Sequence, residues 1–215
     1  MVTAPPLLRL LPSLLAFAWA GAPARGWDAI LRDQSARPVA DAVVSLHPLD
    51  APPPEPAGPA VVEVAQLDRQ YQPFVTPVRV GTVVEFPNRD NIQHHLYSLS
   101  KAKRFEKPLY DGGSRERVEF DQPGVVTLGC NIHDWMIAYV VVLPTPWFAK
   151  SGADGRATVV DAPGGRYRVE VWHPRLGTPV TRELTLVDAS TAEFTLTLKP
   201  ERRLRRAPDS GGRGY

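Results

Sequence analysis

The stretch Gly129-Cys130-Asn131-Ile132-His133-Asp134-Trp135-Met136 concentrates side chains that bind soft metals. It holds the only cysteine of the chain, one of its five histidines and one of its two methionines. Soft sulfur ligands suit Cu(I), and imidazole binds both common oxidation states of copper. A trigonal Cys/His/His set with a long axial Met is the geometry of electron-transfer copper sites, so this stretch lacks only a second histidine.

Two candidates for that second histidine lie upstream, at the end of the segment Asn88-Arg89-Asp90-Asn91-Ile92-Gln93-His94-His95. The segment follows residues 82–86, whose β-branched and aromatic side chains are typical of a strand. Neighbouring residues of a strand point to opposite faces. Only one of His94 and His95 can therefore easily face a metal.

The order and spacing of these residues resemble the ligand loops of the cupredoxins. Cys130-x-x-His133-x-x-Met136 follows the apolar residues 125–128 with amicyanin-like spacing. The segment from Asn88 to His94 is similar to the amicyanin segment that carries the first histidine. The resemblance covers roughly residues 61–143, and the whole chain also resembles the larger periplasmic cupredoxin-like proteins labelled "methylamine utilization protein".

The resemblance implies a cupredoxin-like Greek-key β-sandwich that binds copper. Its ligands would be the Cys130 thiolate, the imidazoles of His94 and His133, and the axial thioether of Met136. His95 stands where the family has an asparagine, and it remains the alternative to His94 as a ligand.

Asp134 is an unusual neighbour for a metal ligand. We expect its negative charge to favour Cu(II) and to lower the reduction potential.

Other interpretations of the same residues exist. A lone buried cysteine or methionine more often serves as a small hydrophobe or core filler. Zinc is the main alternative metal, but zinc sites use several Cys or His ligands and seldom Met. Because soft ligands rarely coincide at this spacing, the combination predicts copper.

The predicted four-ligand set is closed, because no coordination position remains for a substrate. We therefore predict a single-electron carrier, a type 1 (blue) copper protein, rather than an enzyme. Two alternatives stay open: a module for copper delivery or storage, and a structural β-sandwich protein without a redox role. We expect a monomer that binds a redox protein transiently near His133 and Trp135, with no nucleic-acid partner.

The N-terminus has the features of a secretory leader. Arg9 precedes the mostly apolar residues 10–20, and Ala18-Trp19-Ala20 fits a small-x-small cleavage site. The apolar run is too short for a transmembrane span. We predict that residues 1–24 are a signal peptide and that the protein is periplasmic or secreted. A single cysteine cannot form an internal disulfide, and copper would protect its thiol in an oxidising compartment.

The remaining sequence predicts an all-β chain of short alternating segments separated by turns. Residues 25–48 and 149–199 resemble two parts of a carboxypeptidase-regulatory-like (transthyretin-like) β-sandwich, into which the copper domain, residues 60–148, is inserted. Residues 27–32 and 42–47 are expected to pair as a hairpin, and residues 100–109 to hold one short helix. Residues 200–215 are expected to form a disordered basic tail.

Overall fold

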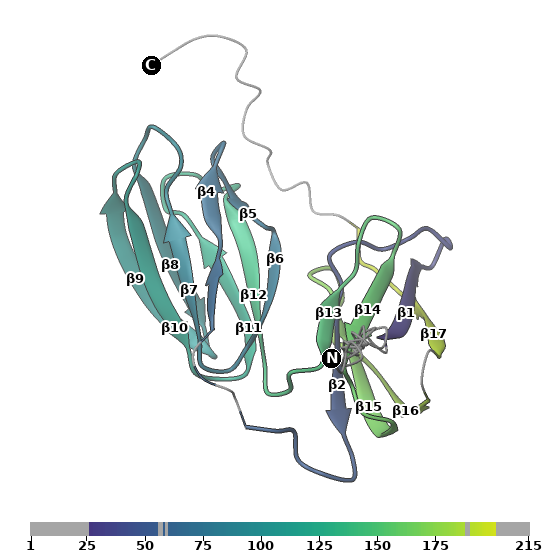
Figure 1. Cartoon of the computed structure of the whole chain (residues 1–215). Coiled ribbons are helices and arrows are strands. Elements are labelled where there is room, and N and C mark those ends of the chain that lie inside the picture. Colours follow the sequence, from purple (N-terminus) through teal and green to yellow (C-terminus); the bar gives the residue numbers. More distant parts are fainter. Residues whose placement is uncertain (1–25, 56–57, 59, 188–189, 201–215) are drawn as a thin grey trace, which may run out of the picture.

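The computed structural model describes residues 26–55, 58, 60–187 and 190–200. These residues form seventeen strands and no helix, so the prediction of an all-β chain is confirmed (Figure 1). Within them, no helix has the length and hydropathy that crossing a membrane requires. The predicted signal peptide and the basic tail after Pro200 lie outside the described residues.

One β-sandwich contains both predicted ligand segments (Figure 1). Its strands are β3 (Val61–Glu63), β6 (Val75–Arg79), β7 (Thr82–Pro87), β8 (His94–Ser100), β9 (Lys103–Tyr110), β10 (Arg115–Phe120), β11 (Gly124–Gly129) and β12 (Ile137–Leu143). A five-stranded sheet has the order β6-β12-β11-β8-β9, and a three-stranded sheet has the order β10-β7-β3. A separate two-stranded hairpin, β4 (Ala65–Leu67) and β5 (Gln70–Gln72), lies beside them.

Buried and partly exposed side chains alternate along the strands, which explains why the two sheets pack on each other. In β7, Val84 and Phe86 are fully buried, while Val83 and Glu85, which alternate with them, are partly exposed. Phe120 and Leu128 face the same core from β10 and β11 and are also fully buried. Burying each such side chain contributes about 1.5–3 kcal/mol, which fixes the register of the strands that carry the site.

A second β-sandwich has its own core. Its strands are β1 (Gly26–Asp33), β2 (Val43–Pro48), β13 (Phe148–Lys150), β14 (Arg156–Val160), β15 (Gly165–Trp172), β16 (Val180–Leu186) and β17 (Thr191–Leu196). They form sheets of the order β14-β1-β17 and β13-β2-β15-β16. Leu31, Leu46 and Leu196 meet in the core between these sheets and are fully buried.

A smaller apolar cluster connects the two sandwiches. Val75 and Val141 on the five-stranded sheet pack with Val43 of β2. The rings of Tyr139 and Trp172 lie edge to face across the same contact, with centroids 5.5 Å apart.

Two predictions of local structure were wrong. Strands β1 and β2 do not pair with each other, because β1 pairs with β14 and β17 while β2 pairs with β13 and β15. Their apolar residues face one core from opposite sheets, and alternation alone does not identify a strand's partner. The expected helix within residues 100–109 is instead most of β9, which pairs with β8. One face of β9 is solvated, so its composition is polar, but Phe105 packs against Phe120.

Candidate metal centre

Strand order brings the two predicted ligand segments together. His94 is the first residue of β8, and Cys130 follows directly after the end of β11. Gly129 of β11 pairs with Tyr97 of β8 on one side and with Ile137 of β12 on the other. The loop 130–136 between β11 and β12 therefore lies beside the start of β8.

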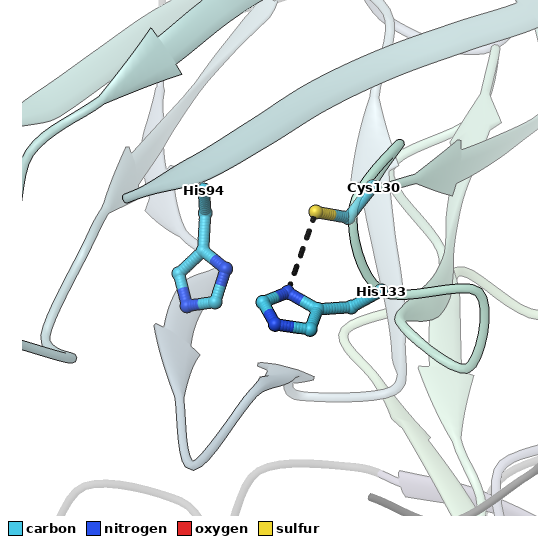
Figure 2. Close-up of side chains that lie close together, drawn as sticks. All are labelled: His94, Cys130 and His133. Carbon is cyan, nitrogen blue, oxygen red and sulfur yellow. Dashed lines mark hydrogen bonds between the residues drawn. The ribbon is translucent and has the colours of Figure 1, made fainter. Parts of the chain in front are cut away.

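The structure places His94, Cys130 and His133 next to one another (Figure 2). One ligand atom of each residue lies within 4.8 Å of those of the other two. Cys130 Sγ is 3.8 Å from His133 Nδ1, and the centroids of the two imidazole rings are 5.0 Å apart. Across the part of the chain that the structure describes, no other group of three His, Cys, Asp or Glu side chains lies this close together.

The three side chains differ in their access to solvent. His94 is fully buried and Cys130 is 4% exposed, whereas His133 is half-buried. Met136 is buried in the same apolar cluster as Cys130. Only the His133 ring among these residues reaches the surface, where the Trp135 ring lies 5.1 Å from it between centroids.

The protonation preferences of Cys130 and His133 suit a metal ligand set, whereas the pKa of His94 is raised, because the Cys130 and Asp90 side chains outweigh the lowering effect of burial. Burial alone would raise the pKa of the Cys130 thiol, but the His94 ring and the backbone N–H groups of Ile132 and His95 outweigh it and lower this pKa. A lowered pKa favours the thiolate, which is the form that binds metals. Burial and the nearby charges of His94 and Arg69 lower the pKa of His133, so its neutral, metal-binding form is favoured.

One buried nitrogen in the group has no hydrogen-bond partner among the described residues. His94 Nε2 lies 2.7 Å from Asp90 Oδ2, but His94 Nδ1 is buried and unpaired. A buried polar atom without a partner is costly unless something binds it. A free imidazole nitrogen beside a thiolate and a second imidazole fits copper, because this donor set is the equatorial set of electron-transfer copper sites.

His95 points away from this group. Its Nε2 lies 2.9 Å from Glu106 Oε1, and its ring lies 5.6 Å from that of Tyr97 between centroids. The His95 backbone N–H, by contrast, helps to lower the pKa of the Cys130 thiol. The structure thus brings the side chain of His94, and not that of His95, into the group of three.

Sequence reasoning missed Tyr71, which joins the two ligand strands from β5. Its side chain is buried, and its hydroxyl oxygen lies 3.1 Å from the His95 carbonyl oxygen and 3.0 Å from that of Gly129. A hydroxyl has one proton, so both carbonyl oxygens share one donor. No motif marks this residue, because its partners are 24 and 58 residues away in the chain.

Replacing Tyr71 with phenylalanine is expected to destabilise the metal-free protein by about 1–3 kcal/mol, because two carbonyl groups next to ligands lose their shared donor. Chemical denaturation of both forms measures the difference. Tyr167→Phe is a matched control, since the Tyr167 hydroxyl is part-buried and bonds only the Pro163 carbonyl oxygen, at 2.8 Å. An unchanged stability for Tyr71→Phe would contradict this role.

No protein-family model matches the chain, and no curated protein does. Among solved structures, a reduced point mutant of amicyanin is 21% identical, with 39% of this chain and 82% of that chain covered and a TM-score of 0.37. A purple cupredoxin from Nitrosopumilus maritimus is 26% identical over 39% of this chain and 99% of its own, with a TM-score of 0.34.

A copper-containing nitrite reductase from Thermus scotoductus is 26% identical, with 54% of this chain but only 28% of the reductase covered and a TM-score of 0.37. Since all three TM-scores are below 0.5, the roles of the residues rest on the geometry of the site itself.

Proposed function

We propose that this chain is an exported type 1 copper protein that transfers single electrons between redox partners. The observation that carries the proposal is the convergence of the Cys130 thiolate with the Nδ1 atoms of His94 and His133 in a mostly buried site. Copper, when bound there, supplies a one-electron couple. The protein supplies two imidazoles and one thiolate from elements that strand pairing holds in place.

Met136 is proposed as the fourth, axial ligand. It is buried next to the loop that carries Cys130 and His133, and a thioether is the usual weak axial ligand of such sites. Four protein ligands leave no coordination position for a substrate. This closed arrangement supports electron transfer rather than catalysis of bond chemistry.

The half-buried His133 ring is the proposed exit for the electron. Trp135 lies beside it, and Ile132, which is 51% exposed, adds apolar surface next to it. Redox partners meet over small, weak interfaces, and an apolar rim around one solvent-facing ligand suits such contacts. We propose that the partner protein binds transiently at this surface.

The alternative of copper delivery or storage fits the site less well. Handing copper to an acceptor requires ligands that the acceptor can replace one at a time. Cys130 and His94 are 4% and 0% exposed, so an acceptor can reach only His133 without opening the loops. This burial favours retention of the metal.

We also propose the division of the chain that the sequence suggested. Residues 60–148 form the copper domain, and residues 25–48 with 149–199 form the second, transthyretin-like domain. The separate buried clusters around Phe86 and around Leu31 support this division. Residues 1–24 would direct export to the periplasm.

A redox titration of the copper-loaded chain tests the proposed function. We expect one copper ion per chain, an intense visible band in the oxidised form, and its full, reversible loss on one-electron reduction. Competition with a Cu(I) chelator separates the alternatives, because an electron carrier retains its metal while a delivery module loses it readily. Failure to bind copper, or irreversible reduction, would contradict the proposal.

A further inference from the structure

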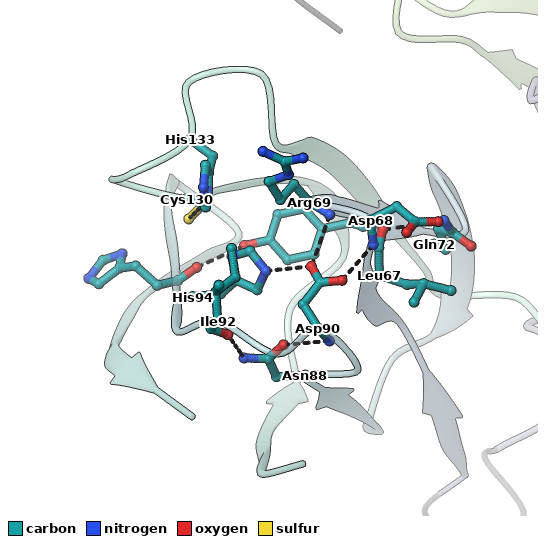
Figure 3. A network of polar contacts seen from close by, with 12 residues as sticks. Leu67, Asp68, Arg69, Gln72, Asn88, Asp90, Ile92, His94, Cys130 and His133 are labelled. Carbon is teal, nitrogen blue, oxygen red and sulfur yellow. Dashed lines mark hydrogen bonds and ion pairs between the residues drawn. The ribbon is translucent and has the colours of Figure 1, made fainter. Parts of the chain in front are cut away.

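The ring of His94, the buried histidine of the site, contacts the Asp90 carboxylate on the side that faces away from Cys130. Asp90 Oδ2 lies 2.7 Å from His94 Nε2, while His94 Nδ1 remains without a protein partner among the described residues (Figure 3). The Asp90 side chain is itself only 11% exposed. The two nitrogens of the ring thus face different surroundings, a carboxylate on one side and the Cys130 sulfur on the other.

Two further hydrogen bonds fix the orientation of this carboxylate. The backbone N–H of Asp68 donates to Asp90 Oδ1 at 2.7 Å, and that of Arg69 donates to Oδ2 at 2.9 Å (Figure 3). An ionised carboxylate accepts hydrogen bonds but donates none. The two backbone N–H groups and His94 Nε2 place three donor groups around this one. Its negative charge is therefore stabilised in place, and the group cannot rotate freely away from His94.

The two donors belong to a strained turn. Asp68 and Arg69 connect β4 to β5, and both have left-handed backbones, with φ of 55° and 56°. A two-residue hairpin turn of this kind usually carries Asn-Gly or Asp-Gly, since a side chain such as that of Arg69 is disfavoured at positive φ. The surroundings must hold such a turn in place, and Asp90 accepts a hydrogen bond from each of its two residues.

The same turn also contacts the second ligand loop. Trp135 Nε1 donates to the Arg69 carbonyl oxygen at 3.1 Å. Trp135 belongs to the loop that carries Cys130 and His133, whereas Asp90 belongs to the loop that carries His94. The 68–69 turn thus connects the two loops that hold the proposed ligands.

We propose that Asp90 is a positioning residue that keeps a proton on His94 Nε2, leaves Nδ1 free to bind the metal, and favours Cu(II) over Cu(I). Only the last part, the preference for Cu(II) over Cu(I), rests on the proposed function. A carboxylate bonded to the outer nitrogen of a ligand histidine orients the ring and makes it a more basic ligand. A nearby negative charge also interacts more favourably with the doubly charged metal than with the singly charged one.

Asp134 is the acidic residue that the sequence singled out, and it provides a matched control. It is exposed, so water and salt screen its charge. Replacing either Asp90 or Asp134 with asparagine removes one negative charge near a proposed ligand at almost constant volume. Only the Asp90 variant changes a group that contacts a ligand ring.

The reduction potentials of Asp90→Asn and Asp134→Asn test the redox part. Asp90→Asn is expected to raise the affinity for Cu(I) relative to Cu(II) about tenfold or more, which is about 59 mV for one electron. Asp134→Asn is expected to shift the potential in the same direction by clearly less. An Asp90→Asn shift equal to or smaller than that of Asp134→Asn would overturn this part.

Nitrogen-15 NMR of the metal-free protein tests the positioning part without copper. In the wild-type chain we expect a downfield, slowly exchanging proton on His94 Nε2, because this nitrogen is buried and bonded to Asp90. The resonance should disappear or exchange rapidly in Asp90→Ala, which has no side-chain acceptor, and stay unchanged in Asp134→Ala. A resonance that survives in Asp90→Ala would overturn the inference, whether or not the protein binds copper.

Discussion

Replacing Cys130 with serine is expected to abolish the intense visible band of the copper-loaded protein. The band of a type 1 site arises from charge transfer between a thiolate and Cu(II), and Cys130 is the only cysteine in the chain. A serine hydroxyl is a hard donor that stays protonated near neutral pH. No other side chain can therefore supply a thiolate, and the expected loss is complete rather than partial.

The optical spectrum after addition of one equivalent of Cu(II) measures this effect. Cys130 is 4% exposed and serine is similar in size, so the strands should remain folded, which far-UV circular dichroism checks. Copper can still bind weakly through the two imidazoles, giving a pale spectrum of nitrogen and oxygen ligation. Retention of the intense band in Cys130→Ser would rule out Cys130 as a ligand and remove the basis of the electron-transfer proposal.

The sequence was most informative where the chemistry is local. Cys130 and His133 are three residues apart in one loop, so their spacing alone places them close together. The alternation of side chains on a strand indicated only that one of His94 and His95 faces the metal, and the resemblance of residues 88–94 to the amicyanin segment favoured His94. In the structure these two side chains point in different directions, one toward Cys130 and the other toward Glu106.

Long-range contacts could not be predicted in this way. Asp90 was part of a recognised segment, but its contacts depend on the turn at Asp68, 22 residues away in the chain. That turn has no Gly or Asn, so its sequence does not mark it as a tight hairpin. Sequence reasoning instead gave weight to Asp134, which neighbours a ligand in sequence but is exposed.

The pairing of the strands could not be predicted from the sequence for the same reason. Local patterns predicted the strands but not their partners, since the alternating β1 and the β-branched β2 belong to different sheets. Strand β9 was hidden by its polar composition, because one of its faces meets water and only Phe105 and the terminal Tyr110 pack against the core. Pairing between strands depends on which faces share a core, and this information is not local in the sequence.

Replacing His94 with alanine is expected to eliminate the visible band, whereas replacing His95 with alanine should leave it in place. His94 Nδ1 is the buried, unpaired nitrogen beside Cys130, so its removal takes away one equatorial donor and leaves a space next to the metal. His95→Ala removes only a ring that bonds Glu106 on the opposite face. Its backbone N–H, which helps to lower the pKa of the Cys130 thiol, is retained in alanine.

The two variants are controls for each other, because both remove one buried imidazole from adjacent positions of β8. A general loss of stability should therefore affect both, and thermal unfolding of the metal-free forms measures that contribution. Added imidazole should restore part of the band to His94→Ala, since it can enter the space left by the ring and supply the missing nitrogen. A band that is lost in His95→Ala and retained in His94→Ala would reassign the ligand, and with it the role proposed for Asp90, because that carboxylate would then orient a histidine that does not touch the metal.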